Sequence, residues 1–72
     1  MKPEIKREYY DNGNISIEYH FLNTLYHRED GPAIIWYLRN GELSYEEYYL
    51  NDKELTYSEF LIHTRKRKLN KL

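Results

Sequence analysis

The sequence of 72 residues repeats itself with a period of 28 residues. A shift by that distance aligns identical residues, among them Tyr9 with Tyr37, Asn12 with Asn40, Gly13 with Gly41, Glu18 with Glu46, Leu22 with Leu50 and Asn23 with Asn51. Apolar positions align as well, because Ile15 corresponds to Leu43 and Phe21 to Tyr49. This pattern is typical of a duplicated supersecondary unit whose copies bury their apolar faces together. The sequence therefore predicts two copies of one small unit.

Each copy contains an Asn-Gly pair, at 12–13 and 40–41. Asn and Gly tolerate the positive φ angles that tight hairpin turns require, so each pair predicts a turn between two strands. A second turn in each copy, at Asn23-Thr24 and Asn51-Asp52, predicts a short third strand. We expect the strands of the first copy at 5–10, 15–21 and 25–27, and those of the second at 33–38, 43–49 and 53–55.

Apolar patterning assigns the faces of these strands. The strand at 15–21 alternates, so Ile15, Ile17, Tyr19 and Phe21 should share one face, and Ser16, Glu18 and His20 the other. The residues at 34–38 are continuously apolar, which is the pattern of a strand covered on both sides. We therefore place this strand at the centre of the sheet.

The only helix signal lies near the C-terminal end. Thr56 and Glu59 have the Thr-x-x-Glu spacing of a capping box, which satisfies free backbone amides at a helix start. A helix is predicted at about 57–69. Apolar or partly apolar residues recur at helical spacing and should cap the sheet: Tyr57, Phe60, Leu61 and Thr64.

Together these signals predict a mainly β fold of the α+β class, with one curved antiparallel sheet and a C-terminal helix. We expect a single domain over 1–72, because a chain of this length buries only one small core. Its parts are repeat 1 at about 5–27, a connecting turn at 28–32, repeat 2 at about 33–55, and the helix.

Composition bears on the compartment. The chain contains no cysteine, so no disulfide or thiolate metal site is available, as is compatible with a reducing cytosol. Met1 leads directly into Lys2, Pro3 and Glu4 without an apolar run of the signal-peptide or membrane-spanning kind. A cytoplasmic protein without membrane contact is expected.

The segment His27-Arg28-Glu29-Asp30-Gly31-Pro32-Ala33, together with Tyr-x-x-Asn-Gly at 9–13 and 37–41, resembles MORN-variant repeats. The resemblance covers residues 9 to about 62. Proteins with such repeats include short phage-encoded, viral and bacterial antitoxin-like proteins. It implies hairpin repeats in a curved sheet and a role in binding rather than catalysis. Ordinary MORN repeats contain more glycine than the three found here, so no lipid or membrane role is expected.

The densest polar cluster lies in the connecting turn. A histidine beside carboxylates, as in His27, Glu29 and Asp30, could hold a divalent metal in a small hydrolase or nuclease, and His20 with Glu18 could complete such a site. The stronger interpretation is structural, because Asp-Gly-Pro is turn chemistry; we assign this role to His27, Asp30, Gly31 and Pro32. No nucleophile elbow, phosphate-binding glycine loop or zinc motif is present, so we predict no enzyme, metal or cofactor.

A protein-binding surface is the first functional hypothesis. Nine tyrosines exceed what a small sheet can bury, so some should be exposed, and many acidic residues lie near them. Tyrosines can anchor a basic protein partner while carboxylates steer its approach. The candidate partner-binding residues are Tyr45, Tyr48, Tyr49, Glu42, Glu46 and Glu47. With the resemblance, this predicts a phage-encoded module that inhibits or modulates a host protein in the host cytoplasm.

Charge suggests an alternative partner. Residues 1–55 carry six Lys or Arg against eleven Asp or Glu, whereas residues 56–72 carry five against one. The basic end could bind nucleic-acid phosphates through Arg65, Lys66, Arg67, Lys68 and Lys71, although the acidic body and the net charge of -1 oppose this.

Open sheet edges predict self-association. A meander of two repeats leaves edge strands unpaired, and pairing them would add the apolar burial that a small cysteine-free chain lacks. We favour a homodimer over a monomer. The opposing features are charged edge residues such as Lys6, Glu8 and Arg39, which deter pairing.

Overall fold

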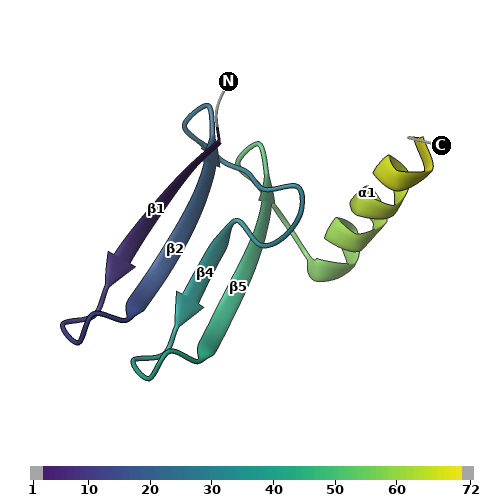
Figure 1. The fold of residues 1–72 in the computed structure, drawn as a ribbon. Coiled ribbons are helices and arrows are strands. Elements are labelled where there is room, and N and C mark those ends of the chain that lie inside the picture. Colours follow the sequence, from purple (N-terminus) through teal and green to yellow (C-terminus); the bar gives the residue numbers. More distant parts are fainter. Residues whose placement is uncertain (1–2, 71–72) are drawn as a thin grey trace.

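The computed structural model describes the backbone of residues 3–70 and the side chains of residues 3–65. It is mainly antiparallel sheet with one C-terminal helix, as the sequence predicts (Figure 1). In chain order the elements are β1 (Pro3–Tyr9), β2 (Ile15–Leu22), β3 (Leu25–Tyr26), β4 (Ile34–Tyr37), β5 (Leu43–Leu50), β6 (Lys53–Leu55) and α1 (Tyr57–Asn70). The predicted strand bounds agree with these to within two residues.

The strands pair in the order β1-β2-β4-β5-β6, and β3 pairs with β2 on the side where β4 also lies. All pairings are antiparallel. The two long hairpins, β1-β2 and β4-β5, therefore lie side by side, with β2 against β4 (Figure 1). In that junction three pairs of residues face each other: Ile17 and Trp36, Glu18 and Ile35, Tyr19 and Ile34.

Positions 28 residues apart have matching backbone geometry. Gly13 and Gly41 both adopt the left-handed region, with φ of 90° and 95°. The second turns match too, since Asn23, Thr24, Asn51 and Asp52 all have positive φ. An irregularity in pairing follows Glu8 in β1 and Trp36 in β4, again 28 residues apart. The same local sequence signals thus produce the same turns in both halves.

The core is small and centred on β4. Its buried residues are Ala33, Ile34, Ile35 and Phe60. Consecutive side chains of a strand point to opposite faces, so burial of both Ile34 and Ile35 means that β4 is covered on both sides. The predicted central position of this strand is confirmed.

Helix α1 begins with the predicted capping box. The Thr56 N–H donates to the Glu59 carboxylate (2.8 Å), and the Glu59 N–H donates to the Thr56 hydroxyl (3.1 Å). The expectation that several helix residues cap the sheet is wrong for Tyr57 and Leu61, which stay exposed because α1 leads away from β5 (Figure 1). Phe60 alone of the predicted set is buried. Within residues 3–70, α1 is not long and apolar enough to cross a membrane.

Candidate functional site

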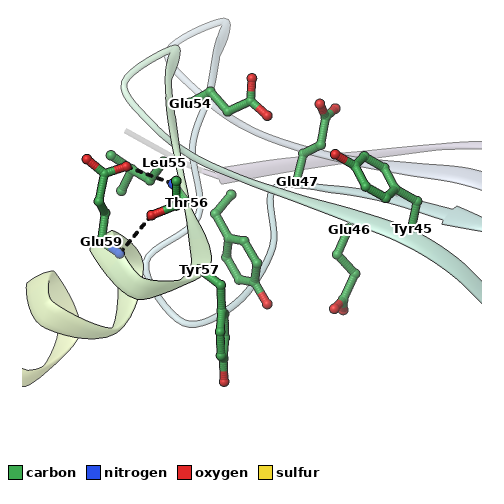
Figure 2. Close-up of a pocket in the computed structure, with 9 residues that line it drawn as sticks. Tyr45, Glu46, Glu47, Glu54, Leu55, Thr56, Tyr57 and Glu59 are labelled. Carbon is green, nitrogen blue, oxygen red and sulfur yellow. Dashed lines mark hydrogen bonds between the residues drawn. The ribbon is translucent and has the colours of Figure 1, made fainter.

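A groove lies between the edge of β5 and the start of α1 (Figure 2). It has a volume of about 450 Å³. The residues that line it come from β5, β6 and the first turn of the helix: Tyr45, Glu46, Glu47, Tyr48, Glu54, Leu55, Thr56, Tyr57 and Glu59. The lining thus combines three tyrosines with four glutamates, and none of the described lysines or arginines belongs to it.

The groove follows an open strand edge. Alternate β5 side chains point to opposite faces of the sheet, and Figure 2 shows Tyr45 and Glu47 on one side of the strand and Glu46 on the other. Both sets border the groove, because it opens at the edge of the strand rather than on a face. Residues 45–47 pair with β4 on one edge, and in the described chain no strand pairs with them on the other.

Two short elements enclose the far side of the groove. The Asn51-Asp52 turn, with positive φ at both residues, returns β6 against the end of β5. The capping box then starts α1 immediately after β6, which places the ring of Tyr57 5.4 Å from that of Tyr48. Phe60 packs beneath, with its ring 4.7 Å from Tyr48. The aromatic wall therefore depends on the turn and the cap together.

The electrostatics of the groove favour binding of a positively charged group. Burial raises the pKa of the Glu47 carboxyl, and the neighbouring Glu54 carboxylate raises it further. Burial also raises the pKa of the Tyr48 phenol, with the Glu46 carboxylate adding to the effect. These shifts mean that the negative charge in the groove is not fully neutralised. A basic side chain that enters the groove would therefore be stabilised.

Four of the six predicted partner-binding residues meet in this groove: Tyr45, Glu46, Glu47 and Tyr48. Tyr49 does not line it, since its ring packs 5.3 Å from that of Tyr26. Glu42 lies in the β4-β5 turn, where it accepts a hydrogen bond from the Asn40 side chain (2.8 Å).

Sequence reasoning missed the part that α1 plays in the groove. Helical spacing predicts that Tyr57 covers the sheet, whereas it is 58% exposed and forms a wall of the groove. The sequence predicts Glu59 only as a capping residue, whereas it also lines the groove. The capping box immediately after β6 was the available signal, because it forces the helix to begin beside β5.

Other tyrosines are structural. On one face of the sheet, rings stack in a continuous row across β2, β3 and β5: Tyr19, Phe21, Tyr26 and Tyr49, with neighbouring centroids 5.1–6.2 Å apart. At the other end of the hairpins, the Tyr10 hydroxyl donates to the Tyr37 carbonyl (2.6 Å). These contacts join the two hairpins, so only part of the tyrosine excess is available for a partner.

The connecting turn is occupied by contacts within the chain. His27 Nδ1 accepts a hydrogen bond from the Asn51 N–H (3.0 Å), and its Nε2 lies 3.5 Å from the Glu29 carboxylate. The Arg28 guanidinium donates to Asp30 (2.9 Å) and lowers the pKa of that carboxyl. A Cβ added to Gly31 would lie 3.0 Å from the Arg28 guanidinium, so the turn packs tightly around it.

His20 and Glu18 do not join His27 in one site. The His20 ring nitrogen lies 2.8 Å from the Glu18 carboxylate and 3.1 Å from the Arg28 guanidinium. Glu18 also accepts a hydrogen bond from Arg7 (2.7 Å). Among the residues that the structure describes, no three His, Asp or Glu side chains are grouped so that they could hold a metal ion.

The proposed nucleic-acid-binding residues are described only in part. Arg65 lies exposed on α1. The side chains of Lys66, Arg67 and Lys68, and the whole of Lys71, lie outside the described residues.

Pro32 ends the connecting turn, where its carbonyl accepts a hydrogen bond from Arg28 (3.3 Å).

Comparison with known proteins found no matching protein-family model, no matching curated protein and no matching solved structure.

Proposed function

We propose that this chain is a non-enzymatic protein-binding module, and that the groove between β5 and α1 is its binding surface. The observation that carries the proposal is the joint presence there of exposed tyrosine and unpaired strand edge: Tyr45 is 57% exposed and Tyr57 58% exposed. Tyrosines supply large, amphipathic contact area and are enriched in protein interfaces. Four glutamates around them suit a partner with a basic surface.

The kind of partner follows from the sequence resemblance. MORN-variant repeats with the His-Arg-Glu-Asp-Gly-Pro-Ala segment at 27–33 occur in phage and antitoxin-like proteins, so we propose membership of that repeat family. On this proposal the chain is phage-encoded and inhibits or modulates a defence or regulatory protein in the host cytoplasm. The contacts of His27, Arg28 and Asp30 support a structural role for the segment, which leaves the groove as the interaction surface.

Affinity capture with a pair of matched variants tests the proposal. Tyr45→Ala removes an anchor from the groove, whereas Tyr9→Ala removes a tyrosine of similar exposure, 60%, outside it. We expect immobilised wild type and Tyr9→Ala to recover the same protein from bacterial lysate, and Tyr45→Ala to recover much less. Circular dichroism should show the same fold for all three proteins.

Salt provides a second criterion, because carboxylate steering weakens as ionic strength rises. Recovery should therefore fall as the salt concentration rises from about 0.05 to about 0.5 M, because the Debye length shortens about threefold over that range. The proposal is wrong if folded wild type recovers no protein reproducibly, or if Tyr45→Ala recovers the partner as well as Tyr9→Ala does. Recovery of nucleic acid in place of protein would instead support the basic C-terminal residues as the binding surface.

A further inference from the structure

The described sheet has two open strand edges, a long one along β1 and a short one along residues 45–47 of β5. β1 pairs only with β2 among the described strands, and every one of its residues is exposed. On the other side of the sheet, β6 pairs only with the last residues of β5, so among the described strands residues 45–47 pair with β4 alone. Strand edges of this kind expose unpaired backbone N–H and C=O groups and pair readily with another strand.

The molecule already contains the interface that would fill the second edge. In the junction between hairpins, residues 17–19 of β2 pair with residues 34–36 of β4. Residues 45–47 stand 28 positions after 17–19, so they are the equivalent edge of the second hairpin. A third strand from the same chain would come from 62–64, but these residues belong to α1. The chain therefore presents this edge without supplying a strand for it.

β1 of another copy of the chain can pair with this edge as β4 pairs with β2, because β1 and β4 occupy matching positions in the two repeats. Residues 6–8 stand 28 positions before residues 34–36, and they lie in the exposed strand β1. We propose that β1 of a second copy adds to the outer edge of β5 as an antiparallel strand, so that copies associate head to tail. The register of the internal junction then places Lys6 opposite Glu47, Arg7 opposite Glu46 and Glu8 opposite Tyr45.

Charge complementarity supports this register. In the internal junction Tyr19 faces Ile34. At the matching position of the proposed junction, Glu47 would face Lys6, so a pair of opposite charges takes the place of the uncharged pair. At the next pair Glu18 faces Ile35, and the equivalent glutamate, Glu46, would face a cation, Arg7. Opposite charges directly across an antiparallel pair stabilise it, and like charges destabilise it.

The sheet already shows that such a cross-strand pair forms. Arg7 and Glu18 face each other in the β1-β2 pairing, and the guanidinium donates to the carboxylate at 2.7 Å. The pKa of the Glu47 carboxyl is raised by burial and by the nearby Glu54 carboxylate, and Lys6 of a second copy would offset both effects. Each ion pair should strengthen association by up to about fivefold.

The same charges disfavour a symmetric pairing. Two β5 edges centred on Glu46 would set one Glu46 carboxylate against the other, as two like charges. A contact between unlike edges leaves one free edge on each outer copy, so it continues beyond two copies unless the chain of copies closes into a ring. The inference goes beyond the proposed function, because it needs no host protein; association between copies would also cover the groove that a host partner uses.

Charge reversal tests the inference by sedimentation equilibrium over a dilution series from micromolar to millimolar protein. The average mass of the wild type should rise above 8.9 kDa with concentration and pass that of two copies. Lys6→Glu and Glu47→Lys should each weaken association by about fivefold, because each removes an opposite pair and sets like charges opposite each other. The double variant Lys6→Glu/Glu47→Lys restores the opposite pair and should return to within about twofold of the wild type.

A matched control and the fold check make the outcomes unambiguous. Glu42→Lys makes the same change of charge in the β4-β5 turn, away from the open edge, and should associate as the wild type does. Circular dichroism should show the same fold for all variants. A wild-type mass fixed at 8.9 kDa, a mass that saturates at two copies, or a double variant no tighter than the single variants would each overturn the inference.

Discussion

Phe60 is the residue through which α1 is attached to the sheet, so Phe60→Ala should release the helix. The Phe60 side chain is only 6% exposed, and its ring lies 4.7 Å from that of Tyr48. The other apolar residues of the helix that the structure describes, Tyr57, Leu61 and Ile62, are exposed. Among the described helix residues, Phe60 is therefore the one whose ring is buried against β5.

The magnitude follows from that burial. Truncation of a buried phenylalanine to alanine costs about 3–5 kcal/mol. A helix of 14 residues is only marginally stable on its own in water, even with a good cap. The free energy lost with the Phe60 ring therefore exceeds the stability that α1 has on its own. We expect the helix to unfold locally in the variant. The strand pairings of β2, β4 and β5 do not involve α1 and should persist.

Amide hydrogen exchange and circular dichroism test this prediction. In Phe60→Ala the amides of 60–65 should lose their protection and the helical signal near 222 nm should fall, while amides in β2 and β4 stay protected. Leu61→Ala is the control: this neighbour is 44% exposed, so its truncation should cost about 1 kcal/mol or less and leave the helix in place. Retention of helix protection in Phe60→Ala would refute the reasoning, because the attachment would then lie elsewhere.

Three further predictions concern turns and protonation. Gly41 has φ of 95° with no atom within 4 Å of an added Cβ, so Gly41→Ala should lower the free energy of unfolding through backbone strain alone, by about 1 kcal/mol in urea titrations. The hydrogen bond from the Thr56 N–H lowers the pKa of the Glu59 carboxyl below its ordinary 4.5; the stability it adds is present above pH 4.5 and lost as pH falls further, so helix content should drop there, whereas Glu59→Gln should show no such drop. The hydrogen bond to Glu8 raises the pKa of the Tyr19 phenol from 10.0 to about 12, so its contribution is complete below pH 10.0 and lost as pH rises towards 12. Ultraviolet titration should find a phenol that titrates near 12 and that Glu8→Gln returns towards 10.0.

Local structure was readable from the sequence because local chemistry produces it. The Asn-Gly turns, the positive φ values at Asn51 and Asp52, and the capping box of α1 each depend on residues within four positions of one another. The continuous apolar run of β4 was enough to place it centrally, since only a strand covered on both faces favours such a run.

The candidate site was predictable only in part. The clustering of tyrosine and glutamate at 45–48 was visible as composition, and the structure gathers those four residues in one groove. Tyr49 carries the same sequence signal, yet its ring belongs to the row of stacked rings against Tyr26. Position 26 lies in β3, far from β5 in the sequence, so no pattern local to β5 distinguishes Tyr49 from Tyr45.

The amino-acid sequence by itself determined the kinds of element, their turns and their order, because backbone preferences and capping act over a few residues. Tertiary structure decided which of the tyrosines remain exposed and how α1 leaves the sheet, with Leu61 and Ile62 open to solvent. It also decided that residues 45–47 of β5 keep one edge without a partner strand among the described residues. These outcomes depend on pairing between residues far apart in the chain, such as Tyr19 with Ile34, and on what space that pairing leaves for each side chain.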